Sequence, residues 1–195
     1  MNTKTPEYDY VISDENVWHV PLFVRGRLSL KKALDGMGDW KLAEKDVPLI
    51  IKLVENPKYN IGLFAGNVSL FAHDCIHVLL GRGLLAKDEA FVIGFTMGST
   101  KKMPRWRKSL FLFCAKHLYP DGYKFSEEDR LVFNMALEAG NRCAVDLSQF
   151  DFEKYKLHSL DGLRSRLKID KTFLRHCYEF EKRCFPESPE SQRLL

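Results

Sequence analysis

The sequence predicts an all-α protein, folded as a single compact helical domain with a metal site between two consecutive antiparallel helices. From about residue 29 onward, apolar residues recur at three- and four-residue spacing and strand-like alternation is scarce. The chain has 195 residues, of which 45% are hydrophobic and 29% charged, as in folded soluble proteins of one domain. A chain of this length buries enough surface to fold without disulfides or a structural metal.

Residues that begin and end helices divide the first half of the chain. Asp46 is an expected N-cap, and the helix that follows it should end before Pro57. A second helix is expected over residues 67–80, because Gly81 supplies a C-terminal stop. The predicted histidine site lies on this second helix.

The second half continues the helical pattern. One helix is expected from Ala86 until it fades at Gly98, and another after Pro104. Ser126, followed by three acidic residues that suit the positive end of a helix dipole, should cap a helix that ends at Gly140-Asn141. Shorter helices are expected at 151–156, 160–167 and 172–183, and residues 186–195 are expected to form a flexible polar tail.

Charge and cysteine content restrict the possible functions. The formal charge of +4 is too small to indicate nucleic-acid binding, so no nucleic-acid partner is expected. No signal or transit peptide is visible, and no apolar run is long enough to span a membrane, so a cytoplasmic protein is expected. Five scattered cysteines without a CxxC pair indicate a reducing compartment: Cys75, Cys114, Cys143, Cys177 and Cys184.

The spacing of two histidines and two acidic residues indicates a metal site. His73 and His77 are four residues apart, which places both imidazoles on one helix face, and Asp74 lies about 100° round from His73. Glu89 follows after a glycine-containing turn, in the first turn of the next helix, which could return its carboxylate to the same point. Two imidazoles and two carboxylates favour Zn²⁺ as the ion, with Fe²⁺ and Mn²⁺ as alternatives.

Other interpretations of these residues are weaker or remain open. Histidines at helical spacing can instead be hydrogen-bonded groups in a core or on a surface. The HExxH motif of zinc proteases requires Glu where this chain has Asp74, and no Glu has a His three residues later, as di-iron bundles require. The isolated His19, His117, His158 and His176 are expected to be structural or surface residues.

These residues resemble a known signature. His73-Asp74-x-x-His77, then eleven residues, then Glu89, is similar to the HDxxH-x11-E motif of the ubiquinone (coenzyme Q) biosynthesis family, whose members assemble or modify the quinone head group. Residues 136–140, 151–153 and 163–169 resemble the closing pattern of this family, although Phe152 stands where Trp is commoner. The resemblance covers about residues 45–170.

The resemblance implies an all-helical homodimer that holds its metal with His73, Asp74, His77 and Glu89. It also implies a hydrophobic channel for a polyprenyl tail, and a lyase reaction that removes the ring carboxylate of a polyprenylated hydroxybenzoate while hydroxylating the same carbon. Some family members are regarded as organisers of a membrane-bound complex of quinone-biosynthesis proteins. No catalytic residue beyond the metal ligands is predicted.

A second feature suggests contact with a membrane surface. Five cations lie within eight residues, beside Trp106 and directly before a run of apolar residues, as in segments that lie on anionic lipid. This would place the protein on the inner face of the cytoplasmic membrane, where a lipid-tailed substrate is collected. The alternative is a solvated basic turn before a core helix. The predicted membrane surface comprises Lys101, Lys102, Arg105, Trp106, Arg107 and Lys108.

Two hypotheses of function follow from the sequence. The first is a metal-dependent decarboxylase of a polyprenylated aromatic acid. The second is a lipid-binding scaffold of a biosynthetic complex, in which the metal is structural. An open coordination position would favour the enzyme, and a closed site would favour the scaffold.

Overall fold

The protein was analysed as a computed structural model, which describes residues 18–23, 28–37, 66–101, 104–121 and 123–195. The described chain is helical, and its only bridge of β type is an isolated one between Ser29 and Ser159. The predicted all-α class is therefore confirmed. The helix expected after Asp46 lies outside the described residues.

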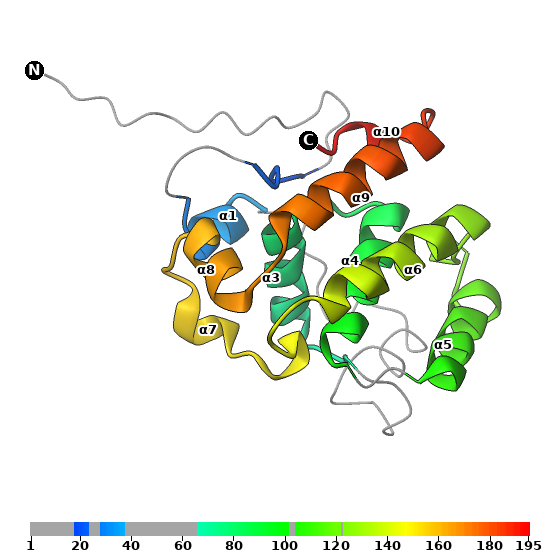
Figure 1. Cartoon of the computed structure of the whole chain (residues 1–195), viewed down its shortest axis with the longest axis horizontal. Helices are drawn as coiled ribbons and strands as arrows, with labels where there is room; N and C mark the ends of the chain where they lie inside the picture. Colours follow the sequence, from blue (N-terminus) through cyan, green and yellow to red (C-terminus); the bar gives the residue numbers. More distant parts are fainter. Residues whose placement is uncertain (1–17, 24–27, 38–65, 102–103, 122) are drawn as a thin grey trace, which may run out of the picture.

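From α3 onward, the described helices follow one another with short connections (Figure 1). α3 lies near the middle of the view. α1 and α8 lie to its left, and α5 lies at the right edge of the molecule. The described helices are α1 (Leu30–Asp35), α3 (Leu70–Leu80), α4 (Ala86–Ser99), α5 (Arg105–His117), α6 (Glu127–Asn141), the 3-10 turn η3 (Leu147–Gln149), α7 (Phe152–Tyr155), α8 (Leu160–Leu167), α9 (Lys171–Cys184) and α10 (Pro189–Gln192).

Among the described helices, α4 and α6 form the closest pair, and glycines make this approach possible. A methyl group at Gly98 of α4 would overlap the carbonyl oxygen of Leu137, and one at Gly140 of α6 would overlap that of Phe95. α6 ends at Asn141, as the Gly140-Asn141 pair predicted. Gly140 also lies where the backbone of α4 passes directly against α6, which leaves no room for a side chain.

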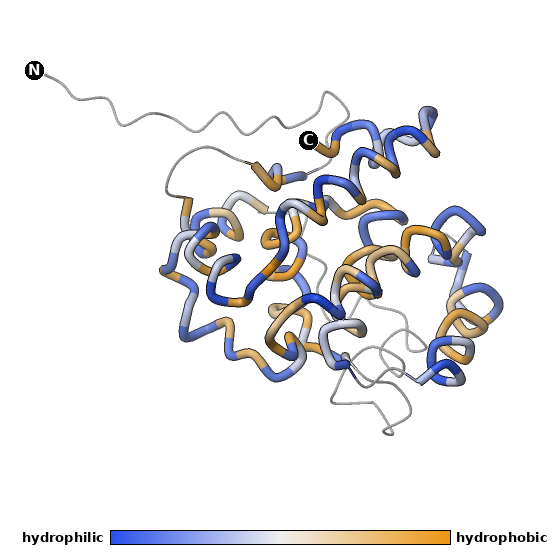
Figure 2. Tube along the Cα trace, viewed as in Figure 1, coloured by the Kyte–Doolittle hydropathy of each residue, from blue (hydrophilic) through white to orange (hydrophobic). Residues whose placement is uncertain are grey.

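Side chains from both ends of the described chain share one core, from Trp18 to Leu194. α4 is almost entirely buried, whereas α9 carries hydrophilic and hydrophobic segments in alternation (Figure 2), as expected of an amphipathic helix that covers a core. Ser126 caps α6 as predicted: its hydroxyl accepts the N–H of Asp129 at 3.1 Å. All five cysteines are free thiols.

Residues 186–195 differ from the predicted flexible tail. They include α10, and the side chains of Ser191 and Leu194 are fully buried. The polar composition of the segment is explained by partners elsewhere in the chain: Arg193 pairs with Asp88, and the Ser191 hydroxyl donates to Glu181 at 3.0 Å. The prediction of a tail was wrong because these partners are distant in sequence.

Candidate metal centre

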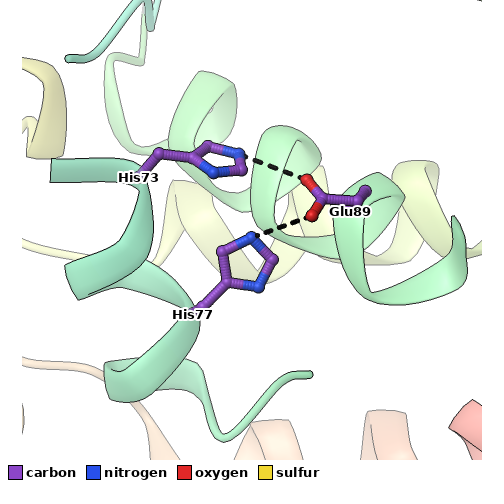
Figure 3. Close-up of side chains that lie close together, drawn as sticks. All are labelled: His73, His77 and Glu89. Carbon is purple, nitrogen blue, oxygen red and sulfur yellow. Dashed lines mark ion pairs between the residues drawn. The ribbon is translucent and has the colours of Figure 1, made fainter. Parts of the chain in front are cut away.

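The two imidazoles of the predicted site come from α3. This helix begins where the Ser69 hydroxyl accepts the N–H of Ala72 at 3.2 Å, and it ends at Gly81, whose φ of 70° is left-handed. His73 and His77 are one turn apart, with ring centroids 4.7 Å from each other. Both rings point toward α4 (Figure 3).

Glu89, in the first turn of α4, meets both rings. Its Oε1 lies 3.4 Å from Nε2 of His77, and its Oε2 lies 3.5 Å from Nε2 of His73 (Figure 3). These distances are too long for good hydrogen bonds, and Nε2 of His73 and both ring nitrogens of His77 are buried without a hydrogen-bond partner. Buried polar atoms without partners are rare in proteins, which indicates that a ligand belongs here.

The two distances between Glu89 and the imidazoles fit a shared ion. Ligands bound to Zn²⁺ at about 2.0–2.1 Å in tetrahedral geometry lie about 3.3–3.4 Å from each other. The atoms from His73, His77 and Glu89 that could hold an ion all lie within 4.8 Å of one another. Two imidazole nitrogens and one carboxylate are a donor set used by Zn²⁺ and by Fe²⁺, and both leave a position open for water or substrate.

Asp74 is not part of this group, although the sequence analysis placed it among the ligands. One residue along a helix turns the side chain by about 100°, away from the face that His73 and His77 share. Its charge nevertheless contributes to raising the pKa of His77. The structure therefore brings together three of the four predicted ligands.

Burial is uneven across the group. The side chain of His77 is fully buried, whereas those of His73 and Glu89 are 17% and 33% exposed. Burial lowers the pKa of His73 to about 4, against the opposing effect of Glu89, so this imidazole is neutral near pH 7, as a metal ligand must be. Burial alone would raise the pKa of Glu89, but the two imidazoles lower it and keep the carboxylate ionised.

Side chains distant in sequence fix the end of α3 that carries His77. Nε and Nη2 of Arg164 donate to the carbonyl oxygens of Leu79 and Val78 at 2.8 and 3.2 Å. The Tyr178 hydroxyl donates to the carbonyl of Leu80 at 2.6 Å. These two residues, from α8 and α9, satisfy carbonyls that a helix end otherwise leaves unpaired.

His19 completes this arrangement: its Nε2 lies 3.0 Å from the carbonyl oxygen of Gly81. It is buried and structural, as expected, and His117, His158 and His176 are exposed. No role was predicted for Arg164 or Tyr178 from the sequence. The signal that could have identified Arg164 is a basic residue on the apolar face of α8.

The predicted membrane surface lies on and just before α5. Lys101 and Arg105 are exposed, Arg107 and Lys108 are partly exposed, and Lys102 lies outside the described residues. Trp106 and Phe113, seven residues apart and thus on the same side of α5, are each 55% exposed. No helix among the described residues is long and apolar enough to span a membrane.

Comparison with protein families, with curated proteins and with solved structures found no match. The resemblance to the ubiquinone-biosynthesis signature therefore remains a prediction from the motif. The structure supports a metal site through the geometry of three side chains.

Proposed function

We propose that the chain is a metal-dependent enzyme of the ubiquinone-biosynthesis type, which binds one divalent ion through His73, His77 and Glu89. Metal binding is supported by the buried imidazole nitrogens, which have no hydrogen-bond partner and lie 3.4 and 3.5 Å from the oxygens of one carboxylate. Zn²⁺ is our first choice, and Fe²⁺ and Mn²⁺ are alternatives that the same donors accept.

The substrate class in this proposal comes from the motif and is a polyprenylated hydroxybenzoate. The ring loses its carboxyl group as CO₂ and gains a hydroxyl group on the same carbon. The balanced reaction consumes one dioxygen molecule, two electrons and two protons per turnover and forms one water. The electrons come from an external donor.

The residues of the site have distinct tasks in this reaction. A bound ion would supply Lewis acidity toward the carboxylate and phenolate oxygens of the substrate. Fully buried His77 anchors the site, whereas His73 and Glu89, which are partly exposed, border its accessible side. Glu89 is ionised and accessible, so its carboxylate can also accept a proton there.

The alternative function is a lipid-binding scaffold with a structural metal. We favour the enzyme, because three ligands with one accessible side leave room for a further ligand, as catalytic metal sites do. A structural zinc site generally has four protein ligands. Whether Asp74 also binds the ion would therefore decide between a catalytic site with three protein ligands and a structural site with four.

The metal is tested by elemental analysis of the purified protein and two variants. We expect about one ion per chain in the wild type, and loss of most of it in His77→Ala and in Glu89→Gln. His176→Ala, which removes an exposed histidine of α9, is the matched control and should keep the ion. Full retention of the ion by both site variants would refute the assignment.

The reaction is tested separately on the metal-loaded protein. With a short-chain prenylated hydroxybenzoate, dioxygen and a reductant, mass spectrometry should detect a product that has lost CO₂ and gained one oxygen atom. A metal-loaded protein that binds the lipid but leaves the carboxylate in place would favour the scaffold.

The lipid tail of this substrate gives the surface of α5 a role in our proposal. Arg105, Arg107 and Lys108 form no ion pair within the described part of the chain, so their charges are available to anionic lipid. Each such residue contributes about 1 kcal/mol near an anionic membrane. Replacing all three by Ala should lower sedimentation with anionic liposomes at low salt and leave the metal content unchanged. Equal sedimentation of both proteins would identify a solvated turn.

A further inference from the structure

The start of α4, which carries Glu89, is fixed by a buried carboxylate. Asp88, the neighbour of Glu89 in sequence, is fully buried, and its Oδ2 accepts the backbone N–H of Leu85 at 3.1 Å. This hydrogen bond satisfies one of the N–H groups that the first turn of a helix leaves unpaired. The position of Asp88 therefore sets the position of the turn from which Glu89 projects.

Two guanidinium groups hold Asp88. Arg193, 105 residues further along the chain, donates to Oδ2 of Asp88. Nη1 of Arg82 lies 3.7 Å from Oδ1. Oδ1 has no hydrogen-bond partner, so the pairing with Arg193 is the closer of the two contacts.

The same buried cluster anchors the C-terminal segment that carries Arg193. Arg82 donates to both oxygens of Glu181 of α9, at 2.9 and 2.5 Å, and its guanidinium stacks 3.9 Å from the ring centre of Phe91. The hydroxyl of Ser191 donates to the same Glu181 carboxylate at 3.0 Å. Two cations face two anions, so the cluster is neutral only while all four charged side chains are present.

We propose that the C-terminal segment is a positioning element of the metal centre: Arg193 holds Asp88, and Asp88 thereby fixes the Glu89 carboxylate opposite the two imidazoles. This inference rests on the proposed metal-binding function. Metal ligands must lie within about 0.5 Å of their productive positions, so a small shift of the first turn of α4 is enough to weaken binding. Residues outside the ligand set that orient ligands typically change metal affinity by about 10–100-fold when they are mutated.

The test measures Zn²⁺ affinity in the full chain by competition with a chromophoric chelator. Arg193→Gln should weaken Zn²⁺ binding about 10–100-fold, and Arg193→Lys, which keeps the charge, should restore part of the loss. Arg183→Gln removes an exposed arginine of α9 and is the matched control, with no expected change. Thermal unfolding of each metal-free protein shows whether the variants are folded.

A second measurement separates positioning from stability. The visible absorption of bound Co²⁺ reports coordination geometry, and we expect its intensity to change in Arg193→Gln but not in Arg183→Gln. If Arg193 acts through Asp88, then adding Arg193→Gln to an Asp88→Asn variant should have little further effect on Zn²⁺ affinity.

Each outcome either supports or overturns the positioning role of Arg193. Wild-type affinity and an unchanged Co²⁺ spectrum in Arg193→Gln would overturn the proposal, and so would full additivity with Asp88→Asn. If neither Arg193 variant folds, the cluster is part of the core and the proposal is also overturned. A wild-type protein that binds no divalent ion would instead refute the proposed function itself.

Discussion

The two ends of α3 differ in how their polar groups are satisfied. At the C-terminal end, four consecutive carbonyls, from Val78 to Gly81, accept hydrogen bonds from buried side chains of distant segments. In the N-terminal half, His73 is partly exposed and its Nε2 has no hydrogen-bond partner. The difference teaches that this fold stabilises one end of the helix and leaves the imidazoles available for a ligand. Changes to the side chains that pair with the carbonyls from Val78 to Gly81 should therefore act mainly on the free energy of unfolding. Changes to the ligand side chains should act mainly on metal affinity.

The largest effect on stability is expected from Arg164→Met. This substitution fills similar space but removes two hydrogen bonds from a charged donor and leaves the buried carbonyl of Leu79 unpaired, while that of Val78 keeps the N–H of Gly81 at 3.3 Å. The free energy of unfolding should therefore fall by roughly 3–5 kcal/mol. Urea denaturation of the metal-free protein measures it. Arg166→Met, an exposed position on the same helix, is the control and should lose less than about 1 kcal/mol. Similar losses in the two variants would mean that the hydrogen bonds of Arg164 to the C-terminal end of α3 add little to the free energy of unfolding.

A smaller effect, dependent on pH, is expected from His19. Burial, together with the positive charges of Arg193 and Arg82, lowers the pKa of His19 from 6.5 to about 4. Above pH 6.5 the imidazole is neutral in both states; as the pH falls from 6.5 toward 4, the unfolded state takes up the proton first, so stability decreases and then levels off. The loss attributable to His19 is at most about 3 kcal/mol.

Comparison with His19→Gln isolates this contribution. His73, whose pKa is also about 4, affects both proteins alike, so the difference between their stability–pH profiles belongs to His19. The experiment is done with a chelator present to exclude metal binding. Parallel profiles of wild type and variant would show that His19 does not titrate differently in the two states.

The smallest effect is expected from Asp74→Asn, beside the imidazoles. Because the Asp74 carboxylate lies outside the group formed by His73, His77 and Glu89, Zn²⁺ affinity should fall by less than about tenfold, or about 1.4 kcal/mol. Isothermal titration measures this change. A loss as large as that of His77→Ala would restore Asp74 as a fourth ligand and with it the closed, structural type of site.

The helices and much of the site could be predicted from local sequence. Ser126 with acids behind it, and Gly81 after an apolar helix, act within one helical turn, so their effect does not depend on the rest of the fold. The spacing of His73 and His77 likewise fixes their shared face. Glu89 was found because only a short connection separates α3 from α4.

What could not be predicted depends on pairs far apart in the chain. Arg193 lies in a segment whose composition is that of a solvated tail, and only its contact with Asp88, 105 residues away, gives it a buried place. Gly140 was predicted only as part of a helix end, whereas its close contact with the backbone of Phe95 in α4 has no local signal in the sequence. Asp74 was predicted as a ligand because it lies only about 100° round the helix from His73, but this offset takes it away from the face that the two imidazoles share.

The glycine contact between α4 and α6 has a consequence for hydrogen exchange. Because Gly98 and Gly140 let the two backbones touch, the amide protons of α4 are screened on that side by another main chain and should exchange only through global opening. The first turn of α3 is only partly buried by the described residues, so its amides should exchange through local fraying. His73 and Glu89 thus lie on segments with different opening free energies, and a bound ion would slow exchange mainly in the first turns of α3.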